Sequence, residues 1–157
     1  MRNFFYLVFT TIAALTLACS SAVAQSSEVA VVVNQKNPVT NLSSAEVRKL
    51  FVGEKRSWSG GLPVKIFVRA PVAHERLVLL KLLGMSESDY KQYWTSQVFR
   101  GEAQAEPIAL FSNGMQREAV VAYEGALALV DVQDVKPGMK VVKVEGHLPG
   151  ESGYPLR

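Results

Sequence analysis

The run Glu-Val-Ala-Val-Val-Val-Asn at residues 28–34 constrains the fold more than any other stretch of this chain. Its apolar residues occupy odd and even positions alike, whereas a strand with one face in water alternates apolar and polar residues. A strand of this kind is covered on both faces, as in the sheets of α/β proteins. Further candidate strands are residues 64–69, 125–131 and 139–146, with a shorter one at residues 106–111.

Helical patterns lie between most of these strands. Ser43 precedes Glu46 by three residues and Ser86 precedes Asp89 by three, and this spacing is typical of a capping box at a helix start. Gly84 follows an apolar run and suits a left-handed helix end. We expect four helices, within residues 41–51, 74–84, 86–99 and 112–125. Strands alternating with helices predict a layered α/β domain.

Residues 1–24 are typical of a secretory signal peptide. Arg2 is followed by an uncharged apolar run at residues 4–18, and Ala22-Val23-Ala24 fits a cleavage site. The run is shorter than the about 20 apolar residues of a membrane span. We therefore expect a periplasmic protein whose residues 25–157 form one domain. Cys19 leaves lipoprotein processing as an alternative, although Thr16 stands where such signals usually have Leu.

Composition and spacing argue against several functions. The formal charge is only +3, and the basic residues form no stripe, so we expect no nucleic-acid partner. His74 and His147 are the only histidines, and neither has a recognisable metal-ligand spacing. With no Gly-x-Ser-x-Gly motif either, we expect no enzyme, no metal site and no cofactor. The carboxylates considered for acid–base chemistry are scattered in sequence: Glu75, Asp89, Glu102, Glu118 and Asp131.

Two strand-to-helix corners are candidate anion sites. Unpaired amides at a helix start attract negative charge, and ligands of open α/β sheets gather where strands lead into helices. One corner is residues 69–76 and the other residues 110–116. Ordinary helix caps and exposed arginines would explain the same residues, so both interpretations stay open. The predicted oxyanion-binding residues are Arg69, His74, Glu75, Arg76, Ser112 and Asn113.

The segment at residues 41–69, NLSSAEVRKLFVGEKRSWSGGLPVKIFVR, resembles phosphate-specific periplasmic binding proteins of ABC transporters, the PstS-like group. The resemblance continues through YKQYW, VFRGE, NGMQREAVVAYEGALALVD and GYPL. It implies one lobe of a type II periplasmic binding protein, with a mixed sheet and helices on both faces. It also implies phosphate or a similar oxyanion as ligand and a transporter membrane component as partner.

One departure from the resemblance bears on function. The relatives follow their arginine with a Ser-Gly-Thr-like run whose hydroxyls hold the anion, whereas residues 69–76 read RAPVAHER and contain no hydroxyl. Arg69 matches and the hydroxyl donors do not. The chain also corresponds to one lobe, which supplies half a cleft and could self-associate to complete it. Two functions therefore remain: oxyanion binding for an ABC transporter, or an interaction module that keeps the fold without the ligand.

Overall fold

Six strands form one mixed sheet in the computed structural model, which describes residues 27–157. The predicted signal peptide at residues 1–24, with Cys19, lies outside the described residues. Central strand β1 is antiparallel to both of its neighbours, while the outer pairings are parallel, so the expected mixed sheet is confirmed. In spatial order the strands are β2 (Asn41–Leu42), β6 (Met139–Val144), β1 (Val29–Asn34), β5 (Ala126–Asp131), β3 (Lys65–Arg69) and β4 (Ile108–Leu110).

The four predicted helices are all present, and their ends follow the expected caps. Ser43 and Glu46 form both halves of a capping box, and Ser86 pairs with Asp89 in the same way. Gly84 ends its helix in the left-handed region, with φ of 69°. The helices are α1 (Ser44–Phe51), α2 (His74–Leu83), α3 (Glu87–Phe99) and α4 (Asn113–Ala122), and a short 3-10 helix, η1 (Val132–Asp134), follows β5.

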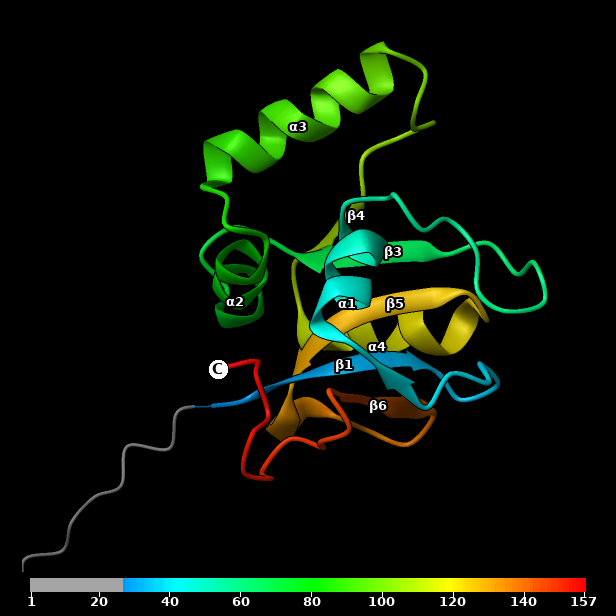
Figure 1. Ribbon diagram of the computed structural model, residues 1–157, viewed down its shortest axis with the longest axis vertical. Helices are drawn as coiled ribbons and strands as arrows, with labels where there is room; N and C mark the ends of the chain where they lie inside the picture. Colours follow the sequence, from blue (N-terminus) through cyan, green and yellow to red (C-terminus); the bar gives the residue numbers. More distant parts are fainter. Residues whose placement is uncertain (1–26) are drawn as a thin grey trace, which may run out of the picture.

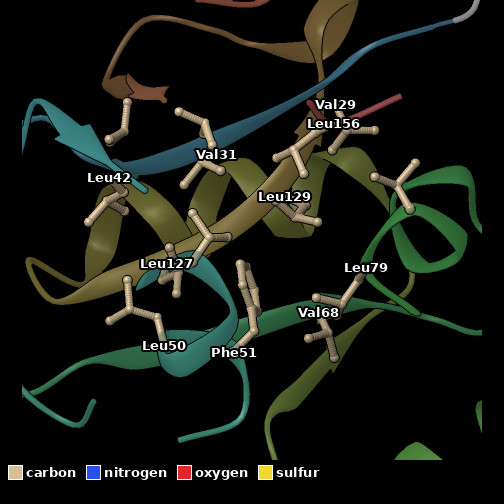
Figure 2. Close-up of a cluster of buried hydrophobic side chains, with 14 of the residues drawn as sticks. Val29, Val31, Leu42, Leu50, Phe51, Val68, Leu79, Leu127, Leu129 and Leu156 are labelled. Atoms are coloured by element: carbon tan, nitrogen blue, oxygen red, sulfur yellow. The ribbon is translucent and has the colours of Figure 1, made fainter. Parts of the chain in front are cut away.

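Helices cover both faces of the sheet, as expected (Figure 1). Every residue of β1 is buried, and its side chains alternate between two cores. Val31 packs in the core shared with α1 and α2, whereas Val32 packs in the core beneath α4. Figure 2 shows Leu50 and Phe51 of α1 directed at Leu127 in the first of these cores. Burial on both faces explains why the strand carries apolar residues at every position.

Helix α3 lies beyond the end of α2, apart from the sheet (Figure 1). Its buried side chains are Tyr90 and Trp94, which belong to the core on the α1 and α2 side. Phe99 at its end is 91% exposed. Within residues 27–157, no helix has both the length and the hydrophobicity that crossing a bilayer requires.

The C-terminal tail runs back across the start of β1 (Figure 1). The amide of Val29 donates to the carbonyl of Leu156 at 3.2 Å, and the Tyr154 hydroxyl donates to the carbonyl of Val29 at 2.7 Å. Both tail side chains are buried. The two-residue strand β2 was not predicted, because two residues are too few to show a periodic pattern.

Candidate functional site

Four residues, 70–73, connect the end of β3 to the start of α2. Val72 in this turn has a positive φ of 67°, and Ala73 is the N-cap of the helix. Ala73 makes no side-chain cap hydrogen bond, so no N-cap side chain satisfies the first amides of α2. These amides form the positive end of the helix dipole.

Glu75 brings a carboxylate to this positive end. It lies in the first turn of α2 and is only 4% exposed. Its Oε1 is 3.4 Å from Nε of Arg69, the last residue of β3. Nη1 of Arg69 donates to the carbonyl of Leu110 at 3.2 Å, which holds the guanidinium in place. The arginine predicted to bind an external anion therefore faces an anion of its own chain.

His74 connects the corner to the end of β5. Its Nδ1 is 3.4 Å from Oδ2 of Asp131, the last residue of that strand, and 3.2 Å from Oγ of Ser27. Asp131 is 8% exposed. Because β5 and β3 are adjacent and parallel, their carboxyl ends meet at one edge of the sheet, and this places Asp131 beside the β3–α2 corner.

The second predicted corner lies at the same edge, because β4 runs parallel to β3. Ser112 is the N-cap of α4, and its Oγ accepts a hydrogen bond from the amide of Met115 at 3.1 Å. Nδ2 of Asn113 donates to Oδ2 of Asp134 in η1 at 2.6 Å. The Ser112 hydroxyl therefore caps α4. The Asn113 side chain instead bonds to Asp134, which lies near Glu75 of the first corner.

Arg76 points away from this group. Its guanidinium donates to both oxygens of Glu87, at 3.0 and 2.6 Å, and lies 4.0 Å from the ring centre of Tyr90. The hydrogen bond from Arg76 lowers the pKa of the Glu87 carboxyl, and burial raises the pKa of Tyr90 to about 12. The structure thus places Arg69, His74 and Glu75 close together but directs Arg76 to α3.

The structure also gathers acids that sequence reasoning kept apart. Carboxylate oxygens of Glu75, Asp131 and Asp134 lie within 4.8 Å of one another. The interpretation of Glu75 and Asp131 as scattered was wrong. They are 56 residues apart in sequence, but the pairing of β3 with β5 brings them together. Asp134 was not a candidate at all. The sequence did contain one signal for Asp131, because it is a charged residue at the end of a buried strand. Arg69 was identified as a candidate from the same position in β3.

Of two hollows in the described region, the larger lies away from residues 69–76, whereas the smaller has Arg69, Pro71 and Arg76 in its lining. The larger, of about 600 Å³, is lined by Ile66 of β3 and Trp94 of α3 among others. The smaller, of about 170 Å³, lies on the α3 side of Arg69 and is lined also by Arg76 and Lys91. Neither hollow is lined by His74, Glu75 or Asp131, so we assign the site by the convergence of these side chains at the edge of the sheet.

Solved structures of phosphate-binding proteins have this architecture. An ABC-type phosphate transport receptor from Vibrio cholerae matches with a TM-score of 0.62 and 22% identity, over 78% of this chain and 48% of that one. The fold matches one lobe of such proteins. A putative phosphate ABC transporter substrate-binding protein from Clostridium perfringens, solved with bound phosphate, matches with a TM-score of 0.61 and 17% identity, over 76% and 45%.

A phosphate-binding protein from Stenotrophomonas maltophilia matches with a TM-score of 0.59 and 20% identity, over 81% of this chain and 41% of that one. The chain thus spans less than half the length of these three structures, and identities this low show the fold alone. No protein-family model matches the sequence, and no curated protein matches it. The resemblance seen in the sequence motifs is confirmed at the level of the fold.

Proposed function

We propose that this protein is a non-enzymatic module that acts outside the cytoplasm and keeps the binding-protein fold, but whose anion corner is closed by its own Glu75 carboxylate. The observation that supports this is the 3.4 Å approach of Glu75 Oε1 to Arg69 Nε at the start of α2. Glu75 places a negative charge beside both the guanidinium and the helix amides, the groups on which an external oxyanion would depend.

Charge at the corner opposes a free oxyanion. Two further carboxylates, Asp131 and Asp134, lie within 4.8 Å of an oxygen of Glu75. At 4 Å, two unit charges interact by about 1 kcal/mol in water and about 4 kcal/mol near a protein surface, so an added phosphate would be repelled by each carboxylate. The turn that matches the relatives' binding loop also contains no hydroxyl. Attraction by one guanidinium does not offset these terms.

Exposed apolar side chains flank the corner and support a role in protein contact. Val72 in the β3–α2 turn is 87% exposed, and Phe111, next to Ser112, is 73% exposed. Val132, directly after Asp131, is 43% exposed. A contiguous exposed apolar patch favours contact with another protein, and we propose that these three side chains contribute to one. The two partners expected from the sequence, a second copy of the chain and a transporter membrane component, are our candidates for this contact.

Calorimetric titration with inorganic phosphate at low ionic strength tests the proposal. We expect no saturable heat from the unmodified chain at millimolar phosphate. Glu75→Gln removes the charge and keeps the size of the side chain, so we expect it to show the saturable phosphate binding that the unmodified chain lacks. Glu118→Gln, at an exposed position of α4, is the matched control and should change nothing. Saturable phosphate binding by the unmodified chain that disappears in Arg69→Ala would overturn the proposal.

Oxyanion binding is the second candidate function. The smaller hollow, of about 170 Å³, supports it, because Arg69, Arg76 and Lys91 line this space, although Glu87 and Glu106 line it too. Of the predicted residues, Arg69 and Arg76 would hold the anion there, with phosphate delivered to an ABC transporter. The others do not line this hollow: His74, Glu75, Ser112 and Asn113. This function requires a phosphate isotherm that weakens when either Arg69 or Arg76 is replaced, which separates it from the first proposal.

A further inference from the structure

We propose that Glu75, Asp131 and Asp134 form a binding site for a hard divalent cation of the Ca²⁺ or Mg²⁺ class. The three residues come from the first turn of α2, the end of β5 and η1. Oxygens bind Ca²⁺ at about 2.3–2.6 Å, so two ligands of one ion are at most about 5 Å apart. The three carboxylate oxygens lie within 4.8 Å of one another, which satisfies this limit for Ca²⁺. Mg²⁺, with bonds of about 2.0–2.1 Å, would require them to lie within about 4.2 Å.

Each carboxylate has a different polar neighbour near one of its oxygens, and for Asp134 this contact is a hydrogen bond. Arg69 Nε lies 3.4 Å from Glu75 Oε1, and His74 Nδ1 lies 3.4 Å from Asp131 Oδ2. Nδ2 of Asn113 donates to Asp134 Oδ2. Outer groups that hold a carboxylate by one oxygen are typical of metal sites, where they position the ligands around the ion.

The remaining oxygen of Asp131 is the observation that points to a ligand. Asp131 is 8% exposed, and its Oδ1 is shielded from water and has no hydrogen-bond partner among residues 27–157. A buried carboxylate oxygen without a partner is unfavourable, and native structures rarely leave one so. A cation bound among the three acids would supply the missing interaction.

The net charge of the cluster also favours a bound cation. Three carboxylates gather beside one guanidinium, so negative charge exceeds positive charge at the cluster. A single divalent cation compensates this excess. All three ligand groups offer oxygen, which favours Ca²⁺ or Mg²⁺ over metals that prefer nitrogen or sulfur.

Thermal unfolding of the full chain, after treatment with EDTA and dialysis, tests the site. We expect millimolar CaCl₂ or MgCl₂ to raise the unfolding midpoint above that in NaCl of equal ionic strength, because an ion that binds only the folded state stabilises it. Asp131→Asn and Asp134→Asn should each weaken the apparent cation affinity at least about tenfold. Glu118→Gln should keep the full response.

The variants also separate ligand loss from misfolding. Replacing Asp131 by Asn relieves repulsion in the metal-free chain, so we expect its midpoint in NaCl to equal or exceed that of the unmodified chain. Should Asp131→Asn not fold, the less buried Asp134 carries the same test. No cation-dependent shift in the unmodified chain overturns the inference, as does a shift that survives both substitutions.

The phosphate titration distinguishes this inference from the proposed function. If neither cations nor phosphate bind, the proposed function stands and the cation site is wrong. If phosphate binds and Arg69→Ala abolishes the binding, the proposed function is wrong, and the cation response alone decides the cation site. A cation response without phosphate binding supports both.

Discussion

Tyr90 shows how one side chain links packing to charge. Its ring lies beneath the Arg76 guanidinium and meets Trp94 edge-on, with ring centres 6.3 Å apart. Burial of the phenol raises its pKa to about 12, above the value near 10 of an exposed tyrosine. The folded state therefore keeps the phenol proton over a range of pH in which the unfolded chain loses it.

This shift predicts how stability changes at alkaline pH. A group with a raised folded pKa contributes stability that is complete below about pH 10 and is lost as the pH rises to about 12. In urea unfolding at about pH 8 and about pH 11, we expect the unmodified chain to lose more stability than Tyr90→Phe. Tyr123→Phe, at an exposed tyrosine, should behave like the unmodified chain. An equal loss in Tyr90→Phe would contradict the assignment of the shift to this residue.

At the scale of elements, the joint between α2 and α3 depends on a bidentate ion pair. Arg76 is 6% exposed, whereas the Glu87 side chain is 43% exposed. Water around the carboxylate weakens the pair, so its contribution is closer to that of a surface pair than to that of a buried one. The pair fixes where α3 leaves the domain and how the smaller hollow is bounded.

A double-mutant cycle measures this joint. With Arg76→Met and Glu87→Gln, we expect a coupling free energy of about 1 kcal/mol from chemical unfolding. Lys36 and Glu124 form a matched control, because they pair at 2.6 Å with side chains 75% and 54% exposed. Their coupling should be near zero at physiological salt. Equal coupling in the two cycles would show that burial of Arg76 adds nothing.

Elements could be predicted from sequence wherever their signal is local. The capping boxes at Ser43 and Ser86 and the apolar run of β1 depend on neighbours within a few residues, and the structure confirms them. The acidic cluster could not be predicted in this way, because it exists only once β5 lies beside β3. Arg69, His74 and Glu75 were found from the strand-to-helix pattern, but their partners required the order of the sheet.

At the scale of the whole molecule, the C-terminal tail closes one end of the sheet. Tyr154 and Leu156 are buried against the start of β1, and Nε of Arg157 lies 2.9 Å from Oε1 of Glu28. Tyr154 and the backbone of residue 156 satisfy both polar backbone groups of Val29. The tail thus completes the environment of a central strand without forming a regular element.

Removing residues 154–157 should therefore destabilise the entire domain. Two buried side chains contribute about 1.5–3 kcal/mol each, so we expect a loss of roughly 3–6 kcal/mol in chemical unfolding. Removing Arg157 alone takes away a partly exposed ion pair and should cost less than about 1 kcal/mol. If both truncations lowered the free energy of unfolding by a similar amount, the Arg157–Glu28 ion pair, and not the burial of Tyr154 and Leu156, would hold the tail in place.

The position of β1 has a consequence for when the domain can form. Val29 pairs with Asp131 and Val31 with Val142, so the innermost strand finds both neighbours near the opposite end of the sequence. Contacts between such distant residues require large loops to close and are typical of slow folding. A growing chain that has not yet reached residue 126 lacks the partner of its first strand. Assembly of the sheet must therefore wait until β5 and β6 have been synthesised.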